Sequence, residues 1–158
     1  MIITVVNRQR RLAIRGDVLR ALAESFMQRA AAMKPRARWL ELTVVLVGHR
    51  AMAAWNQAAL RHEGTTDVIT MRYRSLPGEP RGWRGEIILN AEQADEEGAG
   101  RPGGPARELA LYLAHACQHL GGADDGTPAE RRAMSVRQNR WLRSPAVEPL
   151  IPRLLRIR

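Results

Sequence analysis

Four short runs of β-branched and aliphatic residues, interrupted by helical patterns, constrain the fold of this chain more than any other feature. We predict strands over residues 2–6, 40–47, 67–74 and 85–90. We predict helices between Asp17 and Pro35 and over residues 51–61, 106–120 and 128–142. The order strand, helix, strand, helix, strand, strand, helix, helix predicts an α+β fold, in which a single small mixed β-sheet of about four strands is packed with helices.

Length and composition indicate one globular domain. With 158 residues, of which 45% are hydrophobic and 26% charged, the chain is long enough to bury a core of its own. We predict a single domain over residues 1–143 and a basic, proline-containing tail over residues 144–158. The tail is either loosely ordered or an arm that contacts a partner.

The sequence has the features of a cytoplasmic protein without a membrane partner. No apolar run approaches the roughly 20 residues that a membrane-spanning helix needs. At the amino terminus the basic residues follow the apolar run, whereas a secretory signal has the opposite order. The single cysteine, Cys117, cannot form an internal disulfide, which agrees with a reducing compartment.

The chain is strongly basic, with a formal charge of +9, and of its 25 basic residues only Lys34 is a lysine. A guanidinium binds phosphate through two hydrogen bonds and stacks on bases, so this composition favours contact with RNA, DNA or the ribosome. A GC-rich genome is the alternative explanation. It accounts for arginine in place of lysine, but not for the excess of basic over acidic residues.

The segment HACQHLGGADD, residues 115–125, carries a candidate metal site. Residues four apart share one face of a helix, so His115 and His119 can reach one ion. The helix is expected to end at Gly121 and Gly122, and the turn that follows can bring Asp125 back over the same face. Three protein ligands and one open position are typical of a catalytic zinc site.

Other interpretations of this segment stay open. A pair of histidines in an alanine-rich helix can be accidental, and Asp124 is an alternative ligand to Asp125. The same spacing also occurs in metalloproteases, where a glutamate follows the first histidine and acts as general base. Here that position is Ala116, so a protease would lack its proton acceptor. Cys117 is expected to lie on the opposite side of the helix, in the core.

A second stretch, residues 56–71, ends a helix, crosses a polar turn and enters a strand. In one interpretation, Thr66 and Asp67 are turn residues that bind their own backbone. Taken with the histidine segment, however, the stretch resembles the first motif of the YbeY family of metal-dependent endoribonucleases, which runs N, nine residues, then T-D-V-(L/I)-(S/T)-F. Here the motif reads Asn56 and then Thr66-Asp67-Val68-Ile69-Thr70-Met71.

The resemblance extends over residues 40–142 in the right order. The family signature H-G-x-L-H-L-x-G-Y-D-H is similar to residues 115–125, and its glycine-acid-isoleucine strand is similar to residues 85–94, with Glu86 as the acid. Residues 127–134 continue as in family members that also carry aspartate at the last ligand position.

The chain departs from the family pattern at several positions. Asp125 stands where the signature has its third histidine, and Ala116 where it has a glycine. The family's leucine and tyrosine are replaced by Gln118 and Ala123. A frequent arginine aligns with Leu60, although Arg61 is adjacent. A carboxylate ligand lowers the net charge of a metal site, so we expect weakened activity with binding retained.

The resemblance implies a zinc-dependent, single-strand-specific endoribonuclease that acts in ribosomal RNA (16S 3′ end) maturation and ribosome quality control. It further implies one Zn²⁺ ion held by His115, His119 and Asp125, an RNA phosphate contact from Arg61, and single-stranded RNA, ribosomal RNA and the small ribosomal subunit as partners. Trp83, flanked by arginines, either stacks on a base or anchors its loop. The alternative function is a non-catalytic ribosome- or RNA-associated protein with a structural zinc. The sequence identifies no general base.

Overall fold

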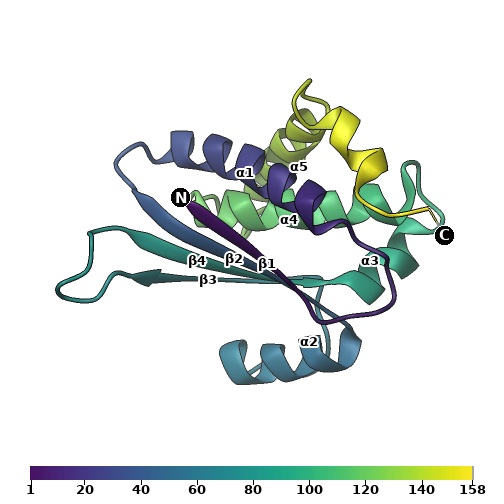
Figure 1. The fold of residues 1–158 in the computed structure, drawn as a ribbon, viewed down its shortest axis with the longest axis horizontal. Coiled ribbons are helices and arrows are strands. Elements are labelled where there is room, and N and C mark those ends of the chain that lie inside the picture. Colours follow the sequence, from purple (N-terminus) through teal and green to yellow (C-terminus); the bar gives the residue numbers. More distant parts are fainter. Residues whose placement is uncertain (158) are drawn as a thin grey trace.

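The computed structural model describes residues 1–157, and its centre is a four-stranded mixed sheet in the order β1-β2-β4-β3 (Figure 1). The strands are β1 (Ile2–Asn7), β2 (Trp39–Val47), β3 (Val68–Arg74) and β4 (Trp83–Asn90). β1, β2 and β4 run parallel, and β3 pairs with β4 in the antiparallel direction. The predicted α+β fold with one mixed sheet of four strands is therefore confirmed.

Helices cover both faces of the sheet. One face carries α1 (Gly16–Met33), α4 (Gly104–Leu120) and α5 (Pro128–Leu142), and the other carries α2 (His49–Trp55), as Figure 1 shows. A π-helical turn, η1 (Asn56–Leu60), continues α2, and the short α3 (Ala91–Gly98) follows β4. Because a crossover between parallel strands needs a connection long enough to return along the sheet, the helices between these strands are a consequence of the parallel pairing.

The alternation of side chains along each strand divides the core into two layers. Leu42, Ile87 and Leu89 belong to the larger cluster, which α1 and α4 cover. Ile69 and Ile88 belong to a smaller cluster that Met52 of α2 closes. Since α4 is buried on almost every side, its sequence is rich in small and aliphatic residues, and it forms the central helix of the larger layer.

The structure adds elements that the sequence patterns did not predict. α3 was missed because it is short and acidic, yet its first turn is capped by Asn90, whose side-chain oxygen accepts the Gln93 backbone N–H at 3.1 Å. β4 begins at Trp83, two residues before the predicted start, and extends the ladder with β3 toward their loop.

The carboxyl-terminal segment is packed onto the domain, where the sequence suggested a loosely ordered tail or a contact arm. It contains a 3₁₀ helix, η2 (Glu148–Arg153), and Val147 and Leu154 are fully buried in the larger core cluster. The Arg15 N–H donates to the Leu154 carbonyl at 2.8 Å, and Ile14 forms a β-bridge with Leu155. The apolar residues of this segment, which the prolines obscure, explain the packing.

Within residues 1–157, no helix combines the length and the apolar character that crossing a membrane requires.

Candidate metal centre

The end of α4 holds the two histidines of the candidate site. His115 and His119 lie one turn apart, and the helix ends after Leu120, as the glycine pair predicted. Gly122 has a φ of 97°, and its N–H donates to the His119 carbonyl at 2.9 Å. A side chain at Gly122 would be strained and would also collide with Lys34. The glycine therefore permits the sharp turn that redirects the chain toward the histidines.

The start of α5 fixes the other end of this turn. Thr127 caps the helix, because its hydroxyl oxygen accepts the Glu130 backbone N–H at 3.1 Å. Arg131, one turn into α5, donates to the Asp125 carbonyl oxygen at 3.2 Å. The predicted cap at Thr127 is thus present. The turn brings Asp125 to the imidazoles, whereas Asp124 is exposed and is not among the clustered side chains.

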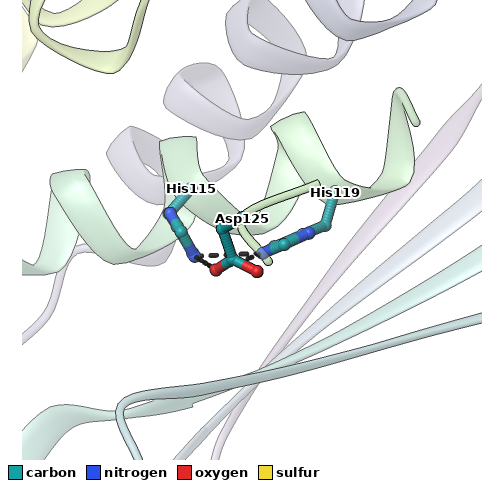
Figure 2. Close-up of side chains that lie close together, drawn as sticks. All are labelled: His115, His119 and Asp125. Carbon is teal, nitrogen blue, oxygen red and sulfur yellow. Dashed lines mark hydrogen bonds and ion pairs between the residues drawn. The ribbon is translucent and has the colours of Figure 1, made fainter. Parts of the chain in front are cut away.

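The three side chains converge on one point, as Figure 2 shows. The Nε2 atoms of His115 and His119 are 3.1 Å apart, and each is 3.4 Å from Oδ2 of Asp125. In a tetrahedral zinc site with metal–ligand bonds of about 2.0–2.1 Å, neighbouring ligand atoms are separated by about 3.3–3.4 Å. The donor set and the spacing of these residues therefore fit a zinc ion.

Hydrogen bonding and burial prepare the imidazoles to act as neutral ligands. His119 Nδ1 lies 3.0 Å from the Ala123 carbonyl, which can only accept, so Nδ1 carries the proton and Nε2 presents its lone pair. Burial, with the nearby charge of His119, lowers the pKa of His115, although Asp67 and Asp125 oppose this effect. The lowered pKa favours the neutral form of His115, which metal coordination requires.

Gln138 of α5 is a site residue that sequence reasoning missed. Among residues 1–157 its buried side-chain oxygen has no hydrogen-bond partner within 3.5 Å, yet the side chain lies near enough to His115 to favour the protonated ring. Gln138 follows buried Met134 by one helical turn, so helical spacing alone would have placed it against α4. An acceptor beside a ligating imidazole typically fixes the orientation of its ring.

Cys117 belongs to the core, as expected, and so does Ala116. Both are fully buried on α4, and burial raises the pKa of the Cys117 thiol. The sulfur is therefore a packing group, and the position after His115 offers no carboxylate to the site.

The first motif shapes the loop that leads into β3. Asn56 is buried and donates to the Gly64 carbonyl at 3.1 Å, and Asp67 accepts from its Thr66 neighbour and from the Val68 N–H. Thr66 and Asp67 therefore have the predicted role in the turn. The negative charge of Asp67 also acts to raise the pKa of His115. Arg61 is exposed at the end of η1, where its φ of 55° is left-handed.

A second histidine–carboxylate cluster lies at the junction of α2 and α3. His49 Nε2 is 3.0 Å from Oε2 of Glu96 and 4.0 Å from Oε2 of Glu92. On the other side of the ring, His49 Nδ1 is 3.0 Å from the side-chain nitrogen of Asn90. The sequence patterns did not indicate this cluster, because His49 lies more than 40 positions before Glu92 and Glu96.

Comparison with known proteins identifies the family. The sequence profile described as Endoribonuclease YbeY matches residues 4–145. The chain is 32% identical over 98 residues to "Endoribonuclease YbeY" of Elusimicrobium minutum, an alignment that covers 60% of this chain and 66% of that protein, just under two thirds. It is 32% identical over 135 residues to the protein of the same name from Frankia alni, covering 80% of this chain and 72% of the relative.

A solved structure supports the fold. The solution structure of TM1509 from Thermotoga maritima superposes with a TM-score of 0.56 and 18% identity, covering 89% of this chain and 87% of that one. The resemblance that the two motifs suggested is confirmed, since the profile match includes both of them. The chain belongs to the YbeY endoribonuclease family.

Proposed function

We propose that this chain is a zinc-dependent endoribonuclease that cleaves single-stranded RNA. The observation that carries the proposal is the spacing of His115 Nε2, His119 Nε2 and Asp125 Oδ2, which matches one face of a zinc tetrahedron. Membership of the YbeY endoribonuclease family supplies the reaction class. The proposed ligands are the same three residues that the sequence suggested, with the carboxylate in the third place.

The surroundings of the three ligands favour catalysis over a purely structural metal. A zinc ion bound there supplies Lewis-acid activation of a phosphoryl oxygen or of water. Structural zinc sites are closed by four protein ligands, whereas only three ligand side chains cluster here among residues 1–157. Their side chains remain 28%, 26% and 45% exposed, so substrate can approach from solvent. These features support an enzyme over the alternative of a non-catalytic RNA-associated protein.

A metzincin-like protease remains disfavoured. Ala116 is fully buried and provides no carboxylate at the position where such proteases carry their general base. The chain therefore lacks the proton acceptor that peptide hydrolysis needs at this position.

The substrate side of the proposal rests on charge and on the first motif. The formal charge of +9 favours association with an anionic polymer. Arg61 is exposed and makes no ion pair among the described residues, and its loop leads to Asp67, whose charge acts on His115. We assign Arg61 to an RNA phosphate. We further propose ribosomal RNA, the 16S 3′ end and the small ribosomal subunit as substrate and partner, in ribosome maturation and quality control in the cytoplasm.

One assay tests the catalytic proposal. Labelled ribosomal RNA precursor is incubated with zinc-loaded wild type, with His119→Ala and with His49→Ala, which removes a histidine that also lies beside carboxylates. We expect cleavage by wild type and by His49→Ala, and none by His119→Ala or after chelation of the metal. Absence of cleavage by wild type, or equal cleavage by wild type and His119→Ala, contradicts the proposal.

A further inference from the structure

Exposed arginines gather at the end of the sheet beyond α4. Val68 of β3 packs against the larger core cluster, on the face of the sheet that α4 covers. Because every second side chain of a strand points to the same face, Arg72 and Arg74 point to this face as well. Arg72 pairs with Gly85 and Arg74 with Trp83 across the β3–β4 ladder. Their guanidinium carbons lie 4.9 and 5.0 Å from the centre of the Trp83 ring. The indole thus positions both guanidinium groups by cation–π contact.

Arg74 and Trp83 border a hollow that is lined by no acidic residue of residues 1–157. A cavity of about 460 Å³ is lined by Arg36, Arg38, Arg74, Arg81 and Trp83, with Ser75 and Gly82 completing the wall. We call Arg36, Arg38, Arg72, Arg74 and Arg81 the arginine cluster. All five are exposed, and none forms an ion pair with a carboxylate of residues 1–157.

The opposite face of the same strands shows the contrast. Arg84 points to the α2 face, where it forms ion pairs of 2.6 Å with Glu79 and 3.3 Å with Glu41. The nearby glutamates therefore neutralise the charge of Arg84 on the α2 face, whereas the positive charges of the arginine cluster have no carboxylate partner within residues 1–157. Like charges held together without a counter-ion are expected to bind an anion.

One basic side chain, Lys34, lies between the arginine cluster and the turn of the candidate metal centre. Lys34, the only lysine, lies against Gly122 in the turn that carries Asp125. Lys34 also lines a second hollow of about 500 Å³, which it shares with Arg36 and Trp83. Leu120, the last residue of α4, lies over Gly85, so the rows of the sheet beyond it, with Arg74 and Trp83, are not covered by this helix.

We propose that the arginine cluster is an anchoring subsite for the backbone of single-stranded RNA, some nucleotides away from the phosphate at the metal centre. The idea rests on the proposed function and names the part of the substrate that lies beyond the reacting bond. Guanidinium groups bind phosphate in bidentate fashion. A concave hollow of this size accepts a splayed nucleotide, which a single strand offers and a base-paired duplex does not. The RNA backbone would run along β3, from Asp67 near His115 to Arg74 at the far end of the strand. A strand rises about 3.3 Å per residue, so the subsite lies on the order of 20 Å from Asp67.

The test measures RNA binding without cleavage. Fluorescence anisotropy follows a labelled single-stranded RNA of about 16 nucleotides in the presence of EDTA, over a series of salt concentrations. The variant Arg36→Gln/Arg74→Gln removes two members of the arginine cluster. Arg50→Gln/Arg153→Gln removes the same charge from two exposed arginines elsewhere, on α2 and η2. All four positions are exposed, so the fold is retained, and thermal melting checks this.

We expect the cluster variant to bind about 10-fold more weakly, with a slope of log K against log salt that is smaller by about 1.4, the loss of two phosphate contacts on a single strand. The control variant is expected to change affinity by about 2-fold or less, because distant charges are screened. Equal losses in the two variants overturn the subsite, since only net charge would then matter. Equal affinity for a fully paired duplex, or equally strong competition by polyglutamate, also overturns it.

These outcomes are separable from those of the nuclease assay. Binding is measured with the metal removed, so the subsite can be supported when wild type fails to cleave. Conversely, loss of cleavage in His119→Ala with unchanged binding of the cluster variant refutes the subsite and leaves the proposed enzyme intact.

Discussion

Two histidine–carboxylate clusters in this molecule have the same kinds of side chain but different hydrogen-bonding partners. Each places its ligand atoms within 4.8 Å of one another. Behind His119 stands the Ala123 carbonyl, which accepts the Nδ1 proton and leaves Nε2 free. Behind His49 stands the Asn90 side-chain nitrogen, which donates to Nδ1. The oxygen of that amide accepts the Gln93 N–H, so the amide cannot turn without losing the cap of α3.

The tautomer that follows separates the two clusters. His49 Nδ1 is an acceptor, so the proton of the neutral ring sits on Nε2 and is donated to Glu96 at 3.0 Å. A metal ion would need the lone pair of His49 Nε2, and in this tautomer the proton occupies that position. The group behind each ring therefore favours zinc at His115, His119 and Asp125 and a structural hydrogen bond at His49. Proximity of ligand atoms alone does not distinguish them.

The largest expected effect is the loss of metal from one cluster alone. His119→Ala removes a proposed ligand, and zinc affinity should fall by more than the roughly 10- to 100-fold that loss of a supporting group causes. After dialysis, elemental analysis should find about one zinc in wild type and in His49→Ala, and almost none in His119→Ala. Loss of zinc in His49→Ala, with retention in His119→Ala, would reverse the comparison.

A smaller effect is expected from the group behind His115. Gln138→Leu keeps the size of the side chain but removes the oxygen that can accept from the ring. We expect zinc affinity to fall about 10-fold. Gln138→Glu retains an acceptor and serves as control, with affinity close to that of wild type. Competition with a zinc chelator measures both. Unchanged affinity in Gln138→Leu would show that Gln138 only packs against α4.

Substitution of the third proposed ligand, Asp125, tests whether a more positively charged site is active at lower pH. Asp125→His places an imidazole where the carboxylate stands, which raises the net positive charge of the loaded site. The acidic limb of the pH–rate profile for RNA cleavage is then expected to move to lower pH, and Asp125→Asn, which has neither the carboxylate charge nor a third imidazole, serves as comparison. A profile that is identical in wild type and Asp125→His would contradict a role for Asp125 at the metal.

The smallest effect concerns the structural role of the α3 carboxylates. The Tyr112 hydroxyl donates to Glu97 at 2.6 Å, and this bond is the main cause that lowers the pKa of Glu97. Since Glu97 is partly exposed, we expect Tyr112→Phe to lower the free energy of unfolding by about 1 kcal/mol at pH 7, without loss of zinc.

The pH dependence of that effect follows from the direction of the shift. A lowered carboxyl pKa contributes stability above the ordinary value of 4.5, and the contribution is lost as pH falls through the folded-state value. The difference between wild type and Tyr112→Phe in urea unfolding should therefore shrink in acid. If the difference in unfolding free energy between wild type and Tyr112→Phe does not change with pH, the effect of the substitution comes from packing and not from the hydrogen bond to Glu97.

Much of the fold was predictable because its signals are local. The four strands, the glycine end of α4 and the cap at Thr127 each depend on residues within a few positions. Elements that depend on distant partners were not predictable. α3 is too polar to show a helical apolar stripe, and the segment after α5 is held by contacts with the residues that precede α1.

The candidate site divides in the same way. His115, His119 and Asp125 lie within eleven positions, so spacing alone brought them together. Gln138, Lys34 and the cluster around Trp83 come from other elements and meet only in the folded chain. The number of basic residues can be counted in the sequence. Which of their charges remain without a carboxylate partner depends on contacts in the fold, such as the ion pairs of Arg84 with Glu79 and Glu41.

The packing of the carboxyl-terminal segment has a practical consequence for truncation and fusion. The family profile ends at residue 145, yet Val147, Ile151 and Leu154 lie beyond it and are buried in the core. Each buried aliphatic side chain stabilises a fold by about 1.5–3 kcal/mol. A shortened version that stops at the profile boundary would expose the hydrophobic surface that these residues cover and would tend to aggregate. Expression trials should therefore keep the chain through the Ile14–Leu155 bridge and attach any affinity tag outside it.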